Sequence, residues 1–177
     1  MKTIYTLLLF LGFGMLVQAQ DSKVVVLYTE QGDQKQVFNI DKASNTLVLT
    51  EKDKTEQDGL FDAFIIKPSI EHPGAVYLIA AQENQMFLKR NGDTLEFKDI
   101  QEETSAVDRD DYEWEIQYSG FPWITISDPA KPRSVIYKEG NTLRVQEVAI
   151  ADWVLANNND PKGEPFRYKI KNITNTF

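Results

Sequence analysis

The sequence predicts an all-β domain built from three similar units, preceded by an export signal. Two observations predict this fold. A turn followed by a strand is written three times, as KASNTLVL at 42–49, RNGDTLEF at 90–97 and KEGNTLRV at 138–145. Hydrophobic and polar residues alternate on both sides of each turn, which is typical of strands with one buried face. A motif repeated at a constant interval of 48 residues indicates that each unit folds in the same way.

The N-terminal residues have the pattern of a secretory signal peptide. Lys2 precedes the apolar run at 7–17, and Ala19 supplies a small residue before an expected cleavage point. The run is shorter than the roughly 20 apolar residues that span a bilayer. We therefore expect residues 1–19 to be a signal peptide and residues 20–177 to form one domain. The mature protein is expected to be soluble and exported, in the periplasm or outside the cell, without membrane insertion.

The first two strands of each unit are expected on either side of a short connection. The first is a run rich in β-branched and aromatic residues, as buried strands commonly are. The second shows alternation up to the repeated turn. The first strands are predicted at 23–29, 75–81 and 122–128, and the second strands at 35–40, 85–90 and 134–139.

The turn and the last two strands complete each unit. Gly92 and Gly140 supply the positive φ that a short hairpin needs, and Asn45 takes this role in the first unit. The third strands are predicted at 46–51, 94–99 and 142–147. The fourth strands, at 62–68, 112–118 and 166–172, each place an aromatic residue and an isoleucine inward: Phe64 and Ile66, Trp114 and Ile116, Tyr168 and Ile170.

Twelve short strands in repeats at approximately 23–70, 75–120 and 122–172 resemble the β-trefoil fold. The resemblance implies a six-stranded barrel made of the first and fourth strands, closed at one end by three hairpins. It indicates a fold without indicating a family. An eight-stranded up-and-down barrel is the alternative, but it predicts longer strands and no threefold period.

Composition excludes several classes of function. The formal net charge of −8 disfavours a nucleic-acid partner. Without cysteine there are no disulfides, no lipid-modified cysteine and no thiolate chemistry. His72 is the only histidine and is expected to be solvated beside the turn at Pro73-Gly74. One histidine and no cysteine disfavour a zinc or copper site, and the acidic stretches at 108–111 and 157–160 lack calcium-loop spacing, so no metal is expected. No cofactor is expected either.

No catalytic motif is present in the sequence. There is no G-x-S-x-G nucleophile context and no glycine-rich phosphate loop before a helix. The 27 acidic residues provide many carboxylate pairs, but nothing singles one pair out. We therefore expect a monomeric binding module and not an enzyme.

The main hypothesis is recognition of an extracytoplasmic protein through the loop at 67–75. Its position resembles that of the loop presented by Kunitz-type plant protease inhibitors, another β-trefoil group. Pro68 and Pro73 restrict the backbone at both ends, which lowers the entropy lost on docking. Ile70 is hydrophobic in a polar loop, beside Glu71 and His72. A protease is the specific form of this hypothesis. The missing disulfide brace counts against it, and a plain connector is the competing interpretation.

The alternative hypothesis is a carbohydrate-binding module with one non-repeated site. Ricin-type lectins carry Gln-x-Trp near the fourth strand, where this chain has Asp62-Ala63-Phe64, Tyr112-Glu113-Trp114 and Phe166-Arg167-Tyr168. The aromatic residue is kept and the glutamine is not, so threefold sugar sites are not expected. The third unit instead has a longer insertion at 148–165, which contains Trp153, Asn158 and Asp160. Trp153 either anchors a ligand or packs over the barrel. Trp114 and Trp123 are expected in the core. An adhesin-like structural role is a third possibility.

Overall fold

The computed structural model describes residues 22–31, 33–57, 59, 62–83, 85–102, 109–156 and 160–173. The expected signal peptide at 1–19 lies outside these residues, and so does Asn158. The strands are β1 (Lys23–Gln31), β2 (Gln34–Asp41), β3 (Thr46–Asp53), β4 (Ala63–Pro68), β5 (Val76–Ala80), β6 (Met86–Asn91), β7 (Thr94–Asp99), β8 (Glu113–Tyr118), β9 (Trp123–Asp128), β10 (Lys131–Glu139), β11 (Thr142–Glu147) and β12 (Tyr168–Asn172). Each predicted strand is present, with boundaries that differ by a few residues.

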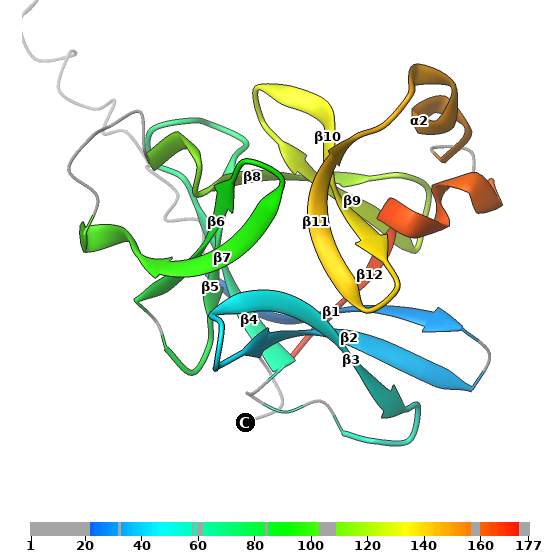
Figure 1. The fold of residues 1–177 in the computed structure, drawn as a ribbon, viewed down its shortest axis with the longest axis horizontal. Helices are drawn as coiled ribbons and strands as arrows, with labels where there is room; N and C mark the ends of the chain where they lie inside the picture. Colours follow the sequence, from blue (N-terminus) through cyan, green and yellow to red (C-terminus); the bar gives the residue numbers. More distant parts are fainter. Residues whose placement is uncertain are drawn as a thin grey trace, which may run out of the picture.

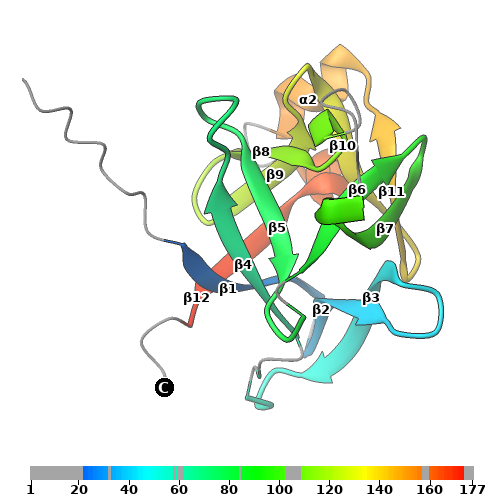
Figure 2. The same ribbon diagram turned by 90° about the vertical axis from the view of Figure 1, so that its left-hand side faces the viewer.

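The first and fourth strands of the three units form a closed six-stranded barrel. Around the barrel, β1 pairs with β4, β4 with β5, β5 with β8, β8 with β9, β9 with β12 and β12 with β1, all antiparallel. Figure 2 shows β1 and β12 side by side where the barrel closes. The register repeats too, with Val25 opposite Phe64, Val76 opposite Trp114 and Ile124 opposite Tyr168. Residues of the three units can therefore be equated one by one.

The second and third strands form three hairpins around a common centre (Figure 1). Their tips are joined in a cycle of backbone hydrogen bonds. Phe97 N donates to the carbonyl oxygen of Asn45 at 2.7 Å and Val145 N to that of Asp93 at 2.8 Å. Leu49 N completes the cycle by donating to the carbonyl oxygen of Asn141 at 3.1 Å. This contact explains why the turn is repeated, because each tip must meet the third strand of its neighbour.

The first hairpin has a longer turn than the other two. Asp41 pairs with Thr46, so residues 42–45 form the turn, whereas Asn91 pairs with Thr94 across two residues. The predicted positive φ values are confirmed, at 53° for Asn45, 64° for Gly92 and 63° for Gly140. The sequence repeat did not show that Lys42 and Ala43 are additional residues in this turn.

One continuous hydrophobic core fills the barrel and the space under the hairpins. The predicted inward aromatic residues Phe64, Trp114 and Tyr168 are all buried in it. Trp114 also donates its indole N–H to the carbonyl oxygen of Leu88 at 3.0 Å. The expectation that Trp123 belongs to the core is wrong, because its ring is only partly buried. The cationic groups of Arg167 and Lys169 lie over the ring, at 5.2 and 5.1 Å from its centroid.

The insertion of the third unit, for which the sequence predicts a loop, contains two short helices. These are α2 (Ile150–Ala156) and the 3-10 helix η3 (Pro161–Phe166). A second 3-10 turn, η2 (Ile100–Glu102), follows β7. Ile150, Trp153 and Val154 have the spacing of one helical face, but only Trp153 packs inward, and Ile150 and Val154 are exposed. In the described part of the chain, no helix has the length and apolar character required to cross a membrane.

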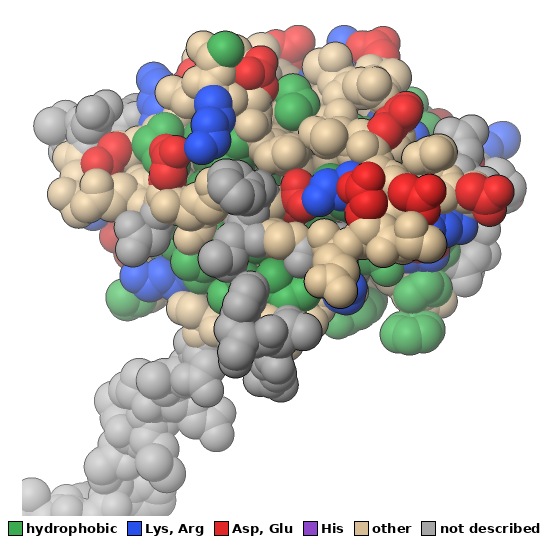
Figure 3. Space-filling view, turned by 90° about the horizontal axis from the view of Figure 1, so that it is seen from below, with side chains coloured by type: hydrophobic (Ala, Val, Ile, Leu, Met, Phe, Trp, Pro, Cys, Tyr) green, Lys and Arg blue, Asp and Glu red, His purple; other side chains and the backbone are tan. Residues whose placement is uncertain are grey.

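Figure 3 shows the face that looks downward in Figure 1, on the side of the β2–β3 hairpin. Acidic and basic side chains lie next to one another across this face, and hydrophobic side chains form small separate groups. On the right-hand half of this view, acidic side chains lie in a row that basic ones interrupt. Ion pairs such as Lys52 with Asp62 and Lys42 with Glu83 join the two kinds of charge near this hairpin and the neighbouring turn.

Candidate functional site

The loop between β4 and β5 is a tight turn that presents Ile70. Ser69 N donates to the carbonyl oxygen of Ala75 at 2.9 Å, and Ala75 N donates to that of His72 at 3.1 Å. The hydroxyl oxygen of Ser69 accepts from the amides of Glu71 and His72 at 3.1 and 3.2 Å. With its ends tied in this way, the loop leaves Ile70 91% exposed. Single exposed hydrophobic side chains are common on protein surfaces, so it is the ordered turn beneath Ile70 that makes it a candidate contact residue.

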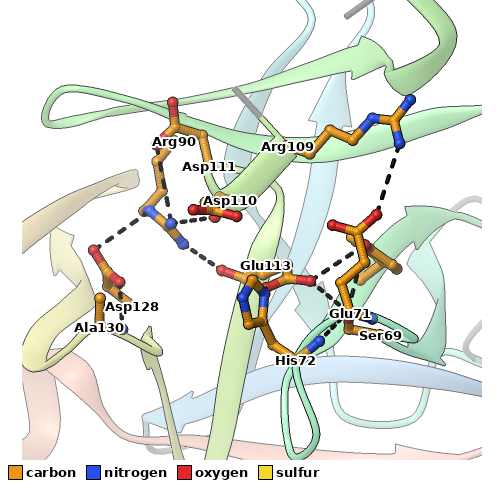
Figure 4. Close-up of polar contacts among 11 residues, drawn as sticks. Ser69, Glu71, His72, Arg90, Arg109, Asp110, Asp111, Glu113, Asp128 and Ala130 are labelled. Atoms are coloured by element: carbon orange, nitrogen blue, oxygen red, sulfur yellow. Dashed lines mark hydrogen bonds and ion pairs between the residues drawn. The ribbon is translucent and has the colours of Figure 1, made fainter. Parts of the chain in front are cut away.

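A buried carboxylate fixes this loop to the barrel (Figure 4). Glu113, the first residue of β8, has a side chain that is only 4% exposed. Its Oε2 lies 2.5 Å from Nδ1 of His72, and its Oε1 accepts from the hydroxyl of Ser69 and, at 3.2 Å, from that of Tyr77. Glu113 therefore ties both Ser69 and His72 of the loop to β8 by hydrogen bonds.

His72 is exposed on the turn, as expected, and its imidazole also has a charged partner that the sequence did not indicate. The side chain is about half exposed, at 54%, and projects from the turn toward β8. The hydrogen bond that the imidazole donates to Glu113 raises the pKa of His72, and the charges of Glu113, Asp110 and Glu71 act in the same direction. Burial is the main reason that the pKa of Tyr77 is raised.

Arg90 organises the segment next to this loop. Its guanidinium donates to the carbonyl oxygens of Glu113 and Asp110, and Nε lies 3.7 Å from Oδ2 of Asp128 on β9. It also lies over the ring of Trp114 at 5.0 Å. Burial lowers the pKa of Arg90, which nevertheless remains a cation in proteins. Residues from β6, β8 and β9 thus meet in a single polar network, as Figure 4 shows.

A cavity of about 320 Å³ lies between the first and second units. Its floor is apolar and consists mostly of small side chains, and its rim carries amides and one ion pair. The floor is formed by Ile40, Ala63, Ala80, Ala81, Met86 and Phe97. The rim is formed by Asn39, Lys42, Asn45, Gln82 and Glu83. This size and this combination of surfaces are characteristic of small-molecule sites.

The cavity results from a difference between the repeats. Register equates Ile40 with Arg90, because each is the residue one before the end of its second strand. It likewise equates Ala63 with Glu113, one residue before the core aromatic of β4 and β8. Ala80 is paired with Phe64 across β4 and β5. Continuing the β8–β9 register by one residue beyond the pair of Glu115 and Ser127 places Asp128 opposite Trp114 in the same way. In the second unit the guanidinium of Arg90 occupies this space, whereas the first unit has only aliphatic side chains there.

The turn between β5 and β6 holds the far wall of the cavity in place. Ala81 N donates to the carbonyl oxygen of Ala63 at 3.1 Å, and Met86 N donates to that of Glu83 at 2.8 Å. On the near side, Asn39 Oδ1 accepts from the amide of Ile40 at 2.8 Å, which orients its side chain. Lys42 and Glu83 lie 4.0 Å apart across the rim. The walls therefore come from both units and are fixed by backbone contacts.

The predicted residues of the third-unit insertion are mainly structural. Trp153 is partly buried and stacks on Phe166 with ring centroids 6.3 Å apart and planes at 15°. Asp160 caps η3, since Oδ1 accepts from the amide of Lys162 at 2.9 Å, and its carbonyl oxygen accepts from Arg167 at 2.7 Å. These residues lie between β11 and β12, whereas Ile70, Glu71 and His72 lie between β4 and β5. Asn158 is outside the described residues.

Sequence reasoning did not single out Glu113 or the cavity residues. The signal was present in the aligned triplets of the fourth strands, whose middle residues are Ala63, Glu113 and Arg167. Ala63 is the one small apolar residue of these three, and it belongs to the unit that lines the cavity. That comparison becomes informative only when the register shows what each position faces.

Comparisons with known proteins place the chain by its fold. No protein-family model matches it, and no curated protein sequence does. Among solved structures, it is similar to SeviL bound to asialo-GM1 saccharide, with a TM-score of 0.57, 12% identity, and coverage of 85% of this chain and 98% of that one. It is also similar to ThreeFoil, a designed threefold symmetric protein, with a TM-score of 0.54 and 10% identity, over 83% of this chain and 96% of that one.

Longer proteins contain a similar part. An arabinofuranosidase complexed with arabinofuranosyl-alpha-1,2-xylobiose matches with a TM-score of 0.63 and 10% identity, over 85% of this chain but only 31% of its own. A mosquitocidal holotoxin matches with a TM-score of 0.61 and 12% identity, over 86% of this chain and 16% of its own. At these identities the likeness concerns the fold alone. The chain has a β-trefoil fold, and no particular family within that fold is indicated.

Proposed function

We propose that this protein is an exported, non-catalytic binding module that recognises carbohydrate at one site, the cavity between its first and second units. The observation that carries this proposal is the cavity itself, with an apolar floor and a polar rim, created where the threefold symmetry is broken. It replaces the site near Trp153 suggested by the sequence, because that ring is stacked on Phe166.

The surfaces of the cavity suit a sugar ring. The C–H face of a ring packs on aliphatic side chains, which Ala63, Ala80 and Met86 supply on the floor. Hydroxyl groups both donate and accept hydrogen bonds, and side-chain amides do the same. Asn39, Asn45 and Gln82 place three such amides on the rim. A volume of about 320 Å³ is at the lower end for small-molecule sites, which favours a single terminal residue of a glycan.

The comparisons support a carbohydrate ligand in preference to other small molecules. The similar structures include a protein bound to a saccharide, which this fold matches along almost its whole length. A partial match is to an arabinofuranosidase complexed with an oligosaccharide. Partial matches to glycoside-cleaving proteins carry no argument for catalysis here, so the module is proposed to bind without cleaving.

A glycan array followed by calorimetry tests this proposal. The mature chain is expected to bind one or a few related glycans with one site per molecule. Ala81→Phe places a large ring in the cavity and should reduce affinity at least tenfold. Ala130→Phe, on the exposed turn between β9 and β10, is the matched control and should leave affinity unchanged. A blank array, or equal affinity for both variants, would contradict the proposal.

A second candidate function, recognition of an exported protein, has its own supporting observation. Ile70 is 91% exposed on a turn that Glu113 and Ser69 hold rigid, so little entropy is lost when the turn docks. A protease partner receives less support, because no similar structure named above is a protease inhibitor.

An affinity pull-down from culture fluid and cell envelope, with wild type compared to Ile70→Asp, tests the second candidate. Recovery of one partner by wild type and not by Ile70→Asp would support it, and a protease among the recovered proteins would revive the inhibitor hypothesis. Equal recovery by both forms would remove Ile70 from the account. The Ala81→Phe variant separates the two functions, since it should retain any protein partner.

A further inference from the structure

We infer that His72, Asp110 and Glu113 form a binding site for one divalent metal ion of the zinc type at the base of the β4–β5 loop. One donor atom from each residue lies within 4.8 Å of the others. The three residues come from separate places in the chain: the β4–β5 turn, the turn before β8, and β8 itself. Nothing in the carbohydrate proposal depends on this site, since the cavity has other walls.

The donor types indicate the class of metal. An imidazole nitrogen with two carboxylate oxygens suits zinc, whose sites combine histidine with Asp or Glu and complete the shell with water. Magnesium prefers oxygen ligands alone and keeps several waters, so it fits this set less well. The set contains no thiolate, because the chain has no cysteine.

The geometry is close to that of a coordinated ion. In a tetrahedral site with bonds of about 2.0–2.1 Å, neighbouring donor atoms are roughly 3.3 Å apart. Nδ1 of His72 and Oε2 of Glu113 are now 2.5 Å apart, and the donor set spans 4.8 Å at most. Binding therefore requires Nδ1 of His72 and Oε2 of Glu113 to move apart by less than about 1 Å. It also requires the carboxylate of Asp110 to approach them by rotation of its side chain. His72 and Asp110 are exposed enough to make these movements.

The residues behind the donors support coordination. Glu113 uses Oε1 for the hydroxyls of Ser69 and Tyr77, which leaves Oε2 directed at His72 (Figure 4). Outer partners of this kind orient a ligand before the metal arrives. Arg90 holds the carbonyl oxygen of Asp110 and so fixes the backbone of the third ligand. The most deeply buried donor is thus also the most firmly positioned one.

The local charge favours a cation. Three carboxylates, those of Glu71, Asp110 and Glu113, act electrostatically on the His72 imidazole. Arg109 offsets one of them, since it lies 3.7 Å from Glu71. Arg90 is a second cation that acts on Asp110 and Glu113, but its hydrogen bonds go to their backbone carbonyl oxygens and leave the carboxylates available. A bound ion would tie the turn that carries Ile70 to both β8 and the segment before it.

Zinc titration of the tag-free mature chain, stripped with EDTA and kept in a non-chelating buffer, tests the inference. Calorimetry should show one Zn²⁺ per molecule and a rise in Tm, with no comparable response to Mg²⁺. His72→Ala and Asp110→Asn should each weaken zinc binding at least tenfold. Asp111→Asn, which removes the neighbouring carboxylate, is the matched control and should change the affinity less than threefold.

Nuclear magnetic resonance supplies a readout that is independent of affinity. His72 is the only histidine, so its ring gives one set of imidazole nitrogen signals. Coordination through Nδ1 should shift that nitrogen far more than Nε2 at one equivalent of zinc. Absence of binding at millimolar zinc, binding that His72→Ala leaves intact, or an unshifted Nδ1 would each overturn the inference. Failure here would leave glycan binding at the cavity untouched.

Discussion

The guanidinium of Arg90 lies 3.7 Å from the carboxylate of Asp128, at the two positions that Ile40 and Ala80 occupy one unit earlier. This exchange of an ion pair for two aliphatic side chains opens space at the first boundary between units. The strands around both boundaries keep the same register. The cavity is therefore a local change of side chains on a repeated backbone, and it can be altered without altering the fold.

Transferring the ion pair should close the cavity. In the double variant Ile40→Arg/Ala80→Asp, the new guanidinium should lie between β2 and β5, as Arg90 does between β6 and β9. Glycan affinity should fall at least tenfold, because the floor of the site is filled and charged. Calorimetry measures the affinity, and circular dichroism with a melting curve verifies that the variant folds. Undiminished affinity in a folded variant would place the glycan elsewhere.

Removing Arg90 should destabilise the fold. Arg90→Ala leaves the carbonyl oxygens of Glu113 and Asp110 without their donor and Asp128 without its partner. The expected loss is about 2–4 kcal/mol, the cost of leaving buried polar and charged groups unpaired. Urea denaturation measures this loss. Arg133→Ala removes a 2.6 Å pair with Glu147 near the surface and one hydrogen bond to the carbonyl oxygen of Val148, and it should cost about 1 kcal/mol. Equal costs would show that Arg90 is not buried in solution.

The repeated hairpin turns should tolerate little change at their positive-φ residue. Gly92 has φ 64°, which an L-residue with a Cβ adopts only with strain. Gly92→Ala should therefore lower the free energy of unfolding by about 1 kcal/mol, although no other atom lies near the new methyl group. Gly59→Ala also meets no neighbour and needs no positive φ, so it serves as the control. A neutral Gly92→Ala would show that the turn changes its conformation readily.

Acid should weaken the closure of the barrel. The hydrogen bond from Lys169 on β12 lowers the pKa of Glu30 on β1 below its ordinary value of 4.5. Because the folded pKa is the lower one, this pair stabilises the fold above the unfolded pKa, and the contribution is lost as pH falls through the folded value. Since both side chains are partly exposed, the contribution should be below about 1 kcal/mol.

Denaturation of wild type and Glu30→Gln at several pH values checks this expectation. Wild type should be the more stable form near pH 6, and the difference should shrink to nothing as pH falls well below 4.5. A difference that stays constant across this range would mean that Glu30 acts by packing and not by charge.

Much of the fold could be predicted from the sequence, because its signals are local and repeated. Alternation identified β7, where Leu95 and Phe97 are buried as predicted. Asn45 and Gly92 marked the turns through their backbone requirements. The sequence does not reveal the longer first turn, because Thr46 and Thr94 keep the 48-residue interval of the repeat. That interval is the same even though the first turn contains additional residues such as Lys42.

The sites could not be predicted in the same way, because each depends on residues far apart in the chain. His72 and Glu113 are 41 positions apart and meet only when β5 pairs with β8. The side chains of Ala63 and Ala80 do not by themselves indicate a site. They matter because the equivalent positions one unit later carry larger side chains. Ile70, by contrast, is recognisable in the sequence as a lone hydrophobic residue in a polar loop, and its side chain is 91% exposed in the structure.

The most direct test of the account is to map the bound glycan on ¹⁵N-labelled protein by nuclear magnetic resonance. The account predicts that the largest amide shifts fall on Asn39, Asn45 and the turn at 80–83, and that the Ile40→Arg/Ala80→Asp variant shows none of them. Shifts concentrated around Trp153, around Ile70, or equally over all three units would contradict a single site between the first two units.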